Sequence, residues 1–208
     1  MPLITKLLFN ENYVVVELES GESLRVSYEA YSQYRLSSGL DLSGDLYAEI
    51  YNESRKFECM SRGLSYLAVR ARSVDEMKKY LKMRNFSDRH IDETVEYLKG
   101  KGYLDDSQFA LMYIKDRMKS GKRGKDLIVR DLFRKGISRR EIDRAVKESG
   151  ADVVNEEALF QLALKKFESV RDKDNPEIRV ANYLRQRGFD YDAIRKILRR
   201  LGRDTDSE

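Results

Sequence analysis

The sequence predicts a mainly α-helical protein, with three tandem three-helix-bundle repeats forming an elongated body behind a small N-terminal α+β head that contains a β-hairpin. Three observations support this prediction. A pattern of apolar residues recurs three times at a spacing of 51 to 52 residues. The 208 residues include only 2 prolines but 37% charged residues, which is typical of helices with much solvated surface. The run YVVVELE near the N-terminus favours a strand.

The head is predicted to span residues 1–55 and to begin with a small sheet. Apolar or alternating runs at 3–9, 13–19 and 22–27 predict three antiparallel strands. Ser20-Gly21, between the last two runs, is typical of a tight hairpin turn.

The rest of the head is predicted to be helical. The apolar spacing indicates a helix over 28–36, a break at Gly39, and a second helix from Ser43 to about Arg55. A head of this size would be only marginally stable alone, so we expect it to pack on the body.

The body is predicted to contain three repeat domains, at residues 56–105, 106–150 and 151–208. Each starts with a long amphipathic helix, expected at about 57–70, 106–120 and 154–170. In every copy the next helix ends at Gly or Asn, which an apolar residue follows: Asn85-Phe86, Gly136-Ile137 and Gly188-Phe189. Gly and Asn enter positive φ at low cost, so these positions are expected to be left-handed caps before a third helix. Tandem copies of such a unit predict the elongated body.

The helix starts agree with this division. Ser73 with Glu76, and Ser138 with Glu141, match the capping-box pattern. Asn175-Pro176 places a capping residue before a proline at the first helical position. The adjacent carboxylates Asp105 and Asp106 are expected to cap the helix that follows them.

Composition excludes several classes of protein. No window is apolar enough for a transmembrane helix, and the N-terminus lacks the features of a signal peptide. The single cysteine, Cys59, excludes an internal disulfide, and one histidine, His90, argues against a zinc site. We therefore expect a cytoplasmic protein with no metal and no cofactor. His90 is expected on the surface, in the first turn of a helix, and Cys59 is expected to be partly buried.

Charge is divided unevenly along the chain. Residues 1–55 carry four positive and nine acidic residues, for a net charge of −5, whereas residues 56–208 have a net charge of +9. The excess is concentrated at 115–144, with net +7, and at 177–203, with net +5. The third repeat prefers Arg to Lys and lacks acidic partners at i,i+4, which favours a binding surface. The partner of such a basic surface would be nucleic acid or an acidic protein surface.

We therefore predict that cationic residues of the second and third repeats bind the partner. These are Lys122, Arg123, Lys125, Arg130, Arg134, Arg185, Arg187, Arg195 and Arg199. The alternative role for such a charge run is a solvated helix face. Part of this set lies in the glycine-containing stretch 121–125, which fails the test for a phosphate-binding loop, because Lys119 and Asp126 stand where that motif needs Gly and Ser or Thr. A basic turn between helices is expected there.

Several residues of the first two repeats resemble the RecX family. They are Arg72-Ser73, Glu76-Met77, Tyr80-Leu81, Gly102-Tyr103-Leu104-Asp105-Asp106, Phe109-Ala110, Tyr113-Ile114, Arg117 and Arg123-Gly124. The Gly-Tyr-Leu-Asp-Asp run followed by Phe-Ala is the most specific part. Tyr103 and Leu104 are also expected to be core residues or to pack between repeats.

The resemblance implies tandem three-helix units and a regulatory, non-catalytic role. Members of this family bind the RecA recombinase, typically in the groove of the RecA–DNA filament, and limit its recombinase and ATPase activities. Some also bind DNA. We therefore expect a monomeric regulator of homologous recombination whose partner is the RecA filament, and not an enzyme. The alternative is a helical repeat protein that binds nucleic acid without reading its sequence.

Overall fold

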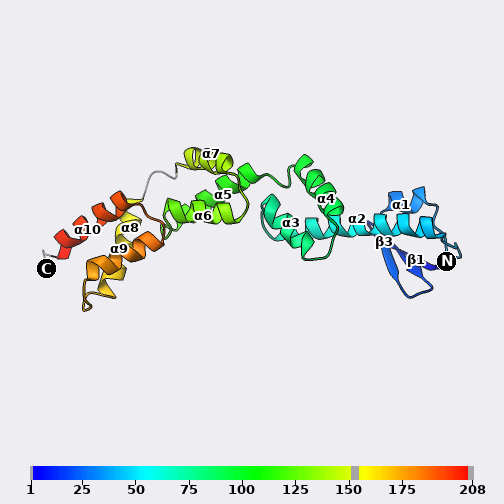
Figure 1. Ribbon diagram of the computed structural model, residues 1–208, viewed down its shortest axis with the longest axis horizontal. Coiled ribbons are helices and arrows are strands. Elements are labelled where there is room, and N and C mark those ends of the chain that lie inside the picture. The colour runs from blue at the N-terminus through cyan, green and yellow to red at the C-terminus, as the bar shows by residue number, and fades with distance from the viewer. Residues whose placement is uncertain (1, 151–154, 206–208) are drawn as a thin grey trace. The chain divides into compact units, whose positions relative to one another are not determined.

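A computed structural model describes residues 2–150 and 155–205 of the 208-residue chain. Contacts divide the chain into two compact units (Figure 1). The first comprises residues 1–72 and 76–104, and the second comprises residues 73–75 and 105–208. The head and most of the first repeat therefore form one unit, and the second and third repeats belong to the other.

The head contains the predicted three-stranded antiparallel sheet. Its strands are β1 (Ile4–Phe9), β2 (Val14–Leu18) and β3 (Ser23–Val26), paired in the order β1-β2-β3. The hairpin turn lies where the sequence predicts it, with Gly21 at φ 82° and its N–H donating to the carbonyl of Leu18 at 2.9 Å. Apolar residues of all three strands and of the following segment form the core of the head.

Two helices follow the sheet, α1 (Tyr28–Gln33) and α2 (Gly44–Val69). The prediction that one helix ends near Arg55 and another begins near residue 57 is wrong, because α2 is continuous through both. No proline interrupts this stretch, and Gly63 is its only internal glycine, with Thr94 and Leu98 close against it. The predicted border between head and first repeat thus falls inside a helix.

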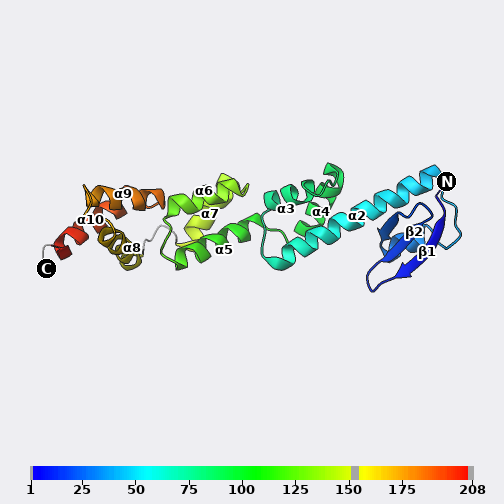
Figure 2. The ribbon, with the colours of Figure 1, turned by 90° about the horizontal axis from the view of Figure 1, so that it is seen from below.

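The long helix α2 serves two cores within the first unit (Figure 2). Near its N-terminal end it lies against the sheet, where the Ser54 hydroxyl accepts the N–H of Arg25 at 3.0 Å. Its C-terminal half forms the first three-helix bundle with α3 (Val74–Lys82) and α4 (Asp88–Gly100). Cys59 is fully buried there, consistent with a packing role, and burial raises the pKa of its thiol.

The second unit contains two further three-helix bundles. Their helices are α5 (Asp106–Lys119), α6 (Lys125–Arg134), α7 (Arg139–Ser149), α8 (Glu156–Glu168), α9 (Pro176–Gln186) and α10 (Tyr191–Thr205). Each bundle has its own apolar core, one formed by α5, α6 and α7 and the other by α8, α9 and α10. The predicted repeat of three helices is confirmed in both.

The left-handed caps are present in all three repeats. Asn85, Gly136 and Gly188 have φ values of 59°, 78° and 81°. In each case the N–H of the next residue donates to a carbonyl five residues back along the chain, as in a Schellman motif. Those next residues, Phe86, Ile137 and Phe189, are buried. The recurring pattern in the sequence therefore marks a recurring cap and apolar plug.

Only some of the predicted helix starts have the expected geometry. Ser138 and Glu141 form a complete capping box at α7, and Asp105 caps α5 by accepting the N–H of Gln108. Pro176 is at the start of α9, but Asn175 makes no side-chain cap. Its φ of 52° is left-handed, whereas a capping side chain needs an extended backbone to reach the helix N–H groups.

A buried serine and a half-buried aspartate make hydrogen bonds at residues 73–75, which belong to the second unit. The hydroxyl of Ser73 donates to the carbonyl of Lys135 at 2.7 Å. A carboxylate oxygen of Asp106 accepts the N–H of Val74 at 2.9 Å, and both residues belong to the second unit. Burial raises the pKa of Asp106, and the N–H of Val74 opposes that effect.

Two further expectations are wrong. Tyr103 is 58% exposed, because the turn at Gly102 (φ 72°) directs Leu104 into the core and leaves the tyrosine outside. His90 is in the first turn of α4 as expected, but it is only 8% exposed. Its Nε2 lies 3.0 Å from Oδ1 of Asn52 on α2. That contact joins residues far apart in sequence, which the local pattern around His90 does not reveal.

The second and third repeats meet through their backbones. The N–H of Gly124 donates to the carbonyl of Arg187 at 2.8 Å, and the N–H of Asp126 donates to the carbonyl of Gly188 at 3.1 Å. A Cβ atom on Gly188 would lie 2.2 Å from the backbone nitrogen of Leu127. The cap that ends α9 therefore has to be glycine for a second reason, which is the close approach of α6.

We predict that Gly188→Ala destabilises the protein far more than Gly150→Ala. Both glycines have positive φ, but space around Gly150 is open. The left-handed conformation alone costs about 1–2 kcal/mol for alanine, and displacing α6 should raise the total for Gly188→Ala to about 3 kcal/mol or more. Urea unfolding followed by circular dichroism measures both. Equal losses for the two variants would contradict a tight contact at Gly188.

We also predict that His90 makes stability decrease in mild acid. Burial lowers the pKa of His90 from its ordinary value of 6.5, and Arg55 and Arg89 add to this effect. The unfolded chain then takes up the proton first, so the free energy of unfolding should fall as the pH drops below 6.5. His90 is the only histidine, so His90→Gln should flatten the curve between pH 7.5 and 5.5. A curve unchanged by this substitution would contradict the prediction.

Candidate partner-binding surfaces

All nine predicted partner-binding residues lie in the second unit, and seven of them form two groups. The first surrounds residues 120–125, which connect α5 to α6 and are named here the basic turn. The second lines a pocket between α9 and α10, named here the Arg groove. Arg130 and Arg134 lie apart from both, exposed on α6.

The basic turn is held in place by the third repeat. A Cβ atom on Gly121 would lie 2.6 Å from Cβ of Ala158 on α8, so the two backbones approach closely. Arg187, at the end of α9, donates from Nη1 to the carbonyl of Lys122 at 3.2 Å. The fold therefore brings predicted residues of two repeats together, with the Lys122 side chain exposed beside Arg187. The expectation of a basic turn between helices is confirmed.

Arg123 has a partner within its own repeat. Its Nη1 lies 2.7 Å from a carboxylate oxygen of Asp131, which is only 17% exposed. The same oxygen accepts the hydroxyl of Tyr113 at 3.3 Å, and Arg134 lies 3.8 Å from the other carboxylate oxygen. Arg123 thus ties the basic turn to α6, which leaves it less available than Lys122 for a partner.

Arg187 is also engaged inside the protein. Its guanidinium lies 4.6 Å from the ring centre of Tyr183, a cation–π contact. Its Nε atom is buried, and no protein group accepts a hydrogen bond from it among the described residues. Arg187 is therefore placed to support the contact between repeats, with part of its hydrogen-bonding capacity unused.

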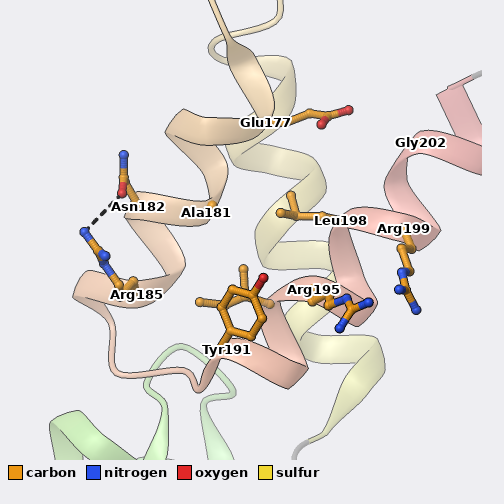
Figure 3. Close-up of a pocket in the computed structure, with 10 residues that line it drawn as sticks. Glu177, Ala181, Asn182, Arg185, Tyr191, Arg195, Leu198, Arg199 and Gly202 are labelled. Carbon is orange, nitrogen blue, oxygen red and sulfur yellow. Dashed lines mark hydrogen bonds between the residues drawn. The ribbon is translucent and has the colours of Figure 1, made fainter.

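The Arg groove has a volume of about 490 Å³ (Figure 3). It brings together three predicted residues, Arg185 from α9 and Arg195 and Arg199 from α10. Its other lining residues are Glu177, Ala181, Asn182, Tyr191, Ile194, Leu198 and Gly202. The groove thus combines cationic side chains with an apolar surface.

The cations of α10 divide between two faces. Lys196 forms an ion pair with Glu156, and Arg200 pairs with Glu157 at 2.9 Å, so one face is neutralised by α8. Arg195 and Arg199 lie on the face that lines the groove. Neither forms an ion pair with any group in the described part of the chain. This face is therefore the one with charge available to a partner.

The prediction of site residues missed the uncharged part of the groove. Tyr191, which is 74% exposed, lines the pocket together with the apolar side chains of Ile194 and Leu198. The spacing of Tyr191, Arg195, Leu198 and Arg199 places them on one side of a helix, and this signal was present in the sequence. The opposite wall, from α9, depends on tertiary packing.

The described residues offer neither a metal centre nor a membrane span. Within 2–150 and 155–205, no three histidine, cysteine, aspartate or glutamate residues gather as a metal site would require. Among the helices that the structure describes, none combines the length and apolar character needed to cross a bilayer.

The fold defines a helical repeat protein with two cationic surfaces in its second unit. Comparison with models of protein families identifies the family to which this repeat protein belongs. Those described as the first, second and third three-helix domains of RecX match residues 59–104, 105–146 and 155–198. Together these matches cover more than half of the chain, and the protein belongs to the RecX family.

Curated relatives carry the same name. Proteins called "Regulatory protein RecX" from Finegoldia magna and Clostridioides difficile are 27% and 26% identical, covering 94% and 97% of this chain and 98% and 96% of theirs. A protein of the same name from Oceanobacillus iheyensis is 28% identical. The alignment covers 85% of this chain and 66% of that relative. This chain is thus a member of a family of regulatory proteins.

Solved structures support the fold. One described as a crystal structure of regulatory protein RecX has a TM-score of 0.72 at 24% identity, covering 95% of this chain and 98% of that one. RecX from Lactobacillus salivarius has a TM-score of 0.62 at 23% identity, covering 71% and 97%.

We predict that Asp131 stabilises the basic turn. Asp131→Asn removes the charge that faces Arg123 and Arg134, and should lower the free energy of unfolding by about 1 kcal/mol. The control is Asp172→Asn, because Asp172 is 93% exposed beside Arg171 and its loss should change stability by less than about 0.5 kcal/mol. Thermal unfolding compares the two. Equal effects would contradict a structural role for Asp131.

Proposed function

We propose that this protein binds the filament that the RecA recombinase forms on DNA and limits its recombinase and ATPase activities. Two independent findings support the proposal. The chain belongs to a family of regulatory proteins named RecX. Seven of the nine cationic residues predicted to bind the partner lie at the basic turn and the Arg groove, within one compact unit. We further propose that it acts in the cytoplasm, as a monomer and without catalysis.

The observation that carries most weight is the division of charge on α10. On a basic face with no binding role, the cations would be expected to form ion pairs with nearby acidic residues. Lys196 and Arg200 do so, with Glu156 and Glu157. Arg195 and Arg199, one residue before each of these, line a pocket instead. Arginines grouped around a pocket are suited to binding carboxylates or phosphates.

The alternative is that the protein binds nucleic acid directly and without sequence preference. The net charge of residues 56–208 favours this possibility, since lysine and arginine would neutralise phosphates. Binding to bare DNA would then weaken steeply with salt, with log K falling by about 0.9 per log unit of salt for each phosphate neutralised. Comparison of bare DNA with the RecA filament at about 150 mM salt separates the two functions.

The test is the ATPase rate of RecA on single-stranded DNA as a function of added protein. We predict inhibition, and we predict that Lys122→Glu/Arg130→Glu raises the concentration needed for half-inhibition by about tenfold or more, equivalent to at least about 1.4 kcal/mol of binding. Both side chains are exposed, and reversing them leaves the pair between Arg123 and Asp131 intact.

The matched control is Lys56→Glu/Lys165→Glu. These lysines are also exposed, and the substitutions change the net charge by the same amount at positions outside the nine predicted partner-binding residues. Circular dichroism should show unchanged helicity in both double variants. No inhibition by the wild-type protein would contradict the proposed function, and equal weakening by both variants would contradict the assigned surface.

A further inference from the structure

We propose that the Arg groove binds a short acidic segment of the partner protein that presents an apolar side chain. This inference rests on the proposed function, because RecA is the protein on which the segment is sought. The groove has the three features that such a ligand needs, namely an apolar floor, a cationic rim and walls that are held in place without the ligand.

The apolar floor of the groove is suited to the apolar side chain of the proposed segment. Ala181 of α9 and Ile194 and Leu198 of α10 line the pocket, and Tyr191 covers one end with a largely exposed ring. The pocket volume of about 490 Å³ is within the range typical of sites that enclose ligand groups. An exposed apolar pocket of this kind gains free energy when an apolar side chain displaces water from it.

The cationic rim of the groove is suited to the acidic residues of the proposed segment. Arg185, Arg195 and Arg199 approach the pocket from two helices, and each can hold a carboxylate through paired N–H donors. Figure 3 shows Arg185 and Tyr191 at one end of the groove and Glu177 at the other. An acidic side chain would therefore be attracted to the end with Arg185 and repelled from the end with Glu177.

Glu177 also decides between a peptide and a nucleic acid. A nucleic-acid strand carries a charge on every phosphate, so a strand along the groove would bring one phosphate near this carboxylate. A peptide can place its acidic residues beside the arginines and an uncharged or basic residue beside Glu177. The charge pattern of the groove is thus complementary to a protein segment of mixed composition.

One wall of the groove, α10, is fixed by contacts on its outer side, and one rim side chain on α9 is held by a neighbour on the same helix. On α10, Arg200 pairs with Glu157 and lies 3.8 Å from the ring centre of Phe160, so this helix is held against α8. On α9, an amide oxygen of Asn182 accepts a hydrogen bond from Arg185 at 3.3 Å, which holds that guanidinium at the rim. A pocket formed in advance reduces the ordering that binding requires.

The experiment places a photo-crosslinking residue at the mouth of the groove in the full-length protein. Tyr191→p-benzoylphenylalanine is irradiated with the RecA filament on single-stranded DNA, and crosslinked peptides are identified by mass spectrometry. We expect a RecA peptide with at least two Asp or Glu residues next to an apolar residue. The control is Tyr97→p-benzoylphenylalanine. Tyr97 is an exposed residue of α4, and the probe there should not give that peptide. Adding Arg195→Gln/Arg199→Gln to the Tyr191 probe should reduce the crosslink at least tenfold.

Cosedimentation with the filament is measured in parallel to separate the two proposals. If the protein cosediments but position 191 crosslinks to DNA, to a RecA segment without acidic residues, or to nothing, the inference about the groove is overturned and the proposed function stands. The same holds if the arginine substitutions leave the crosslink unchanged. If the protein does not cosediment with the filament, both proposals are overturned.

Discussion

The left-handed residue at the end of the middle helix in each repeat is the constraint on which the rest of the structure depends. Asn85, Gly136 and Gly188 reverse the direction of the chain, bury the apolar residue that follows, and allow the third helix to start. At Gly188 the missing side chain has a second effect, because it lets α6 approach until the two backbones share hydrogen bonds. A left-handed residue therefore closes each bundle, and in the third bundle, where it is glycine, it also joins the second bundle to the third.

That backbone contact determines where the charged residues lie. With Gly188 against Leu127 and Gly121 against Ala158, the basic turn has little freedom to move away from the third repeat. Arg187 then meets the carbonyl of Lys122. A cationic surface that combines residues more than 60 positions apart in the chain thus follows from this close packing of backbones.

Much of the fold could be predicted from the sequence, because its determinants are local and recur. A left-handed cap, an apolar plug and a capping serine or aspartate each occupy fixed positions relative to a helix end, and three copies distinguish this pattern from chance. The wrongly predicted border near Arg55 lies where the charge of the chain changes from acidic to basic. That change does not alter the helical preference of the backbone, so α2 continues through it. The burial of His90 was missed because Asn52, its partner, lies on another helix. Neither error involves a residue of the repeating pattern.

The cationic surfaces show why counting charges could identify a region and not a site. Helix α10 carries two adjacent pairs of cations, Arg195-Lys196 and Arg199-Arg200, and helical periodicity alone puts Arg195 and Arg199 on one stripe and Lys196 and Arg200 on the next. The sequence does not say which stripe will meet acids. Packing against α8 brings Glu156 and Glu157 to the second stripe, which is thereby used to hold the bundle together. The first stripe keeps its charge, and the pocket between α9 and α10 is where that charge meets an apolar floor.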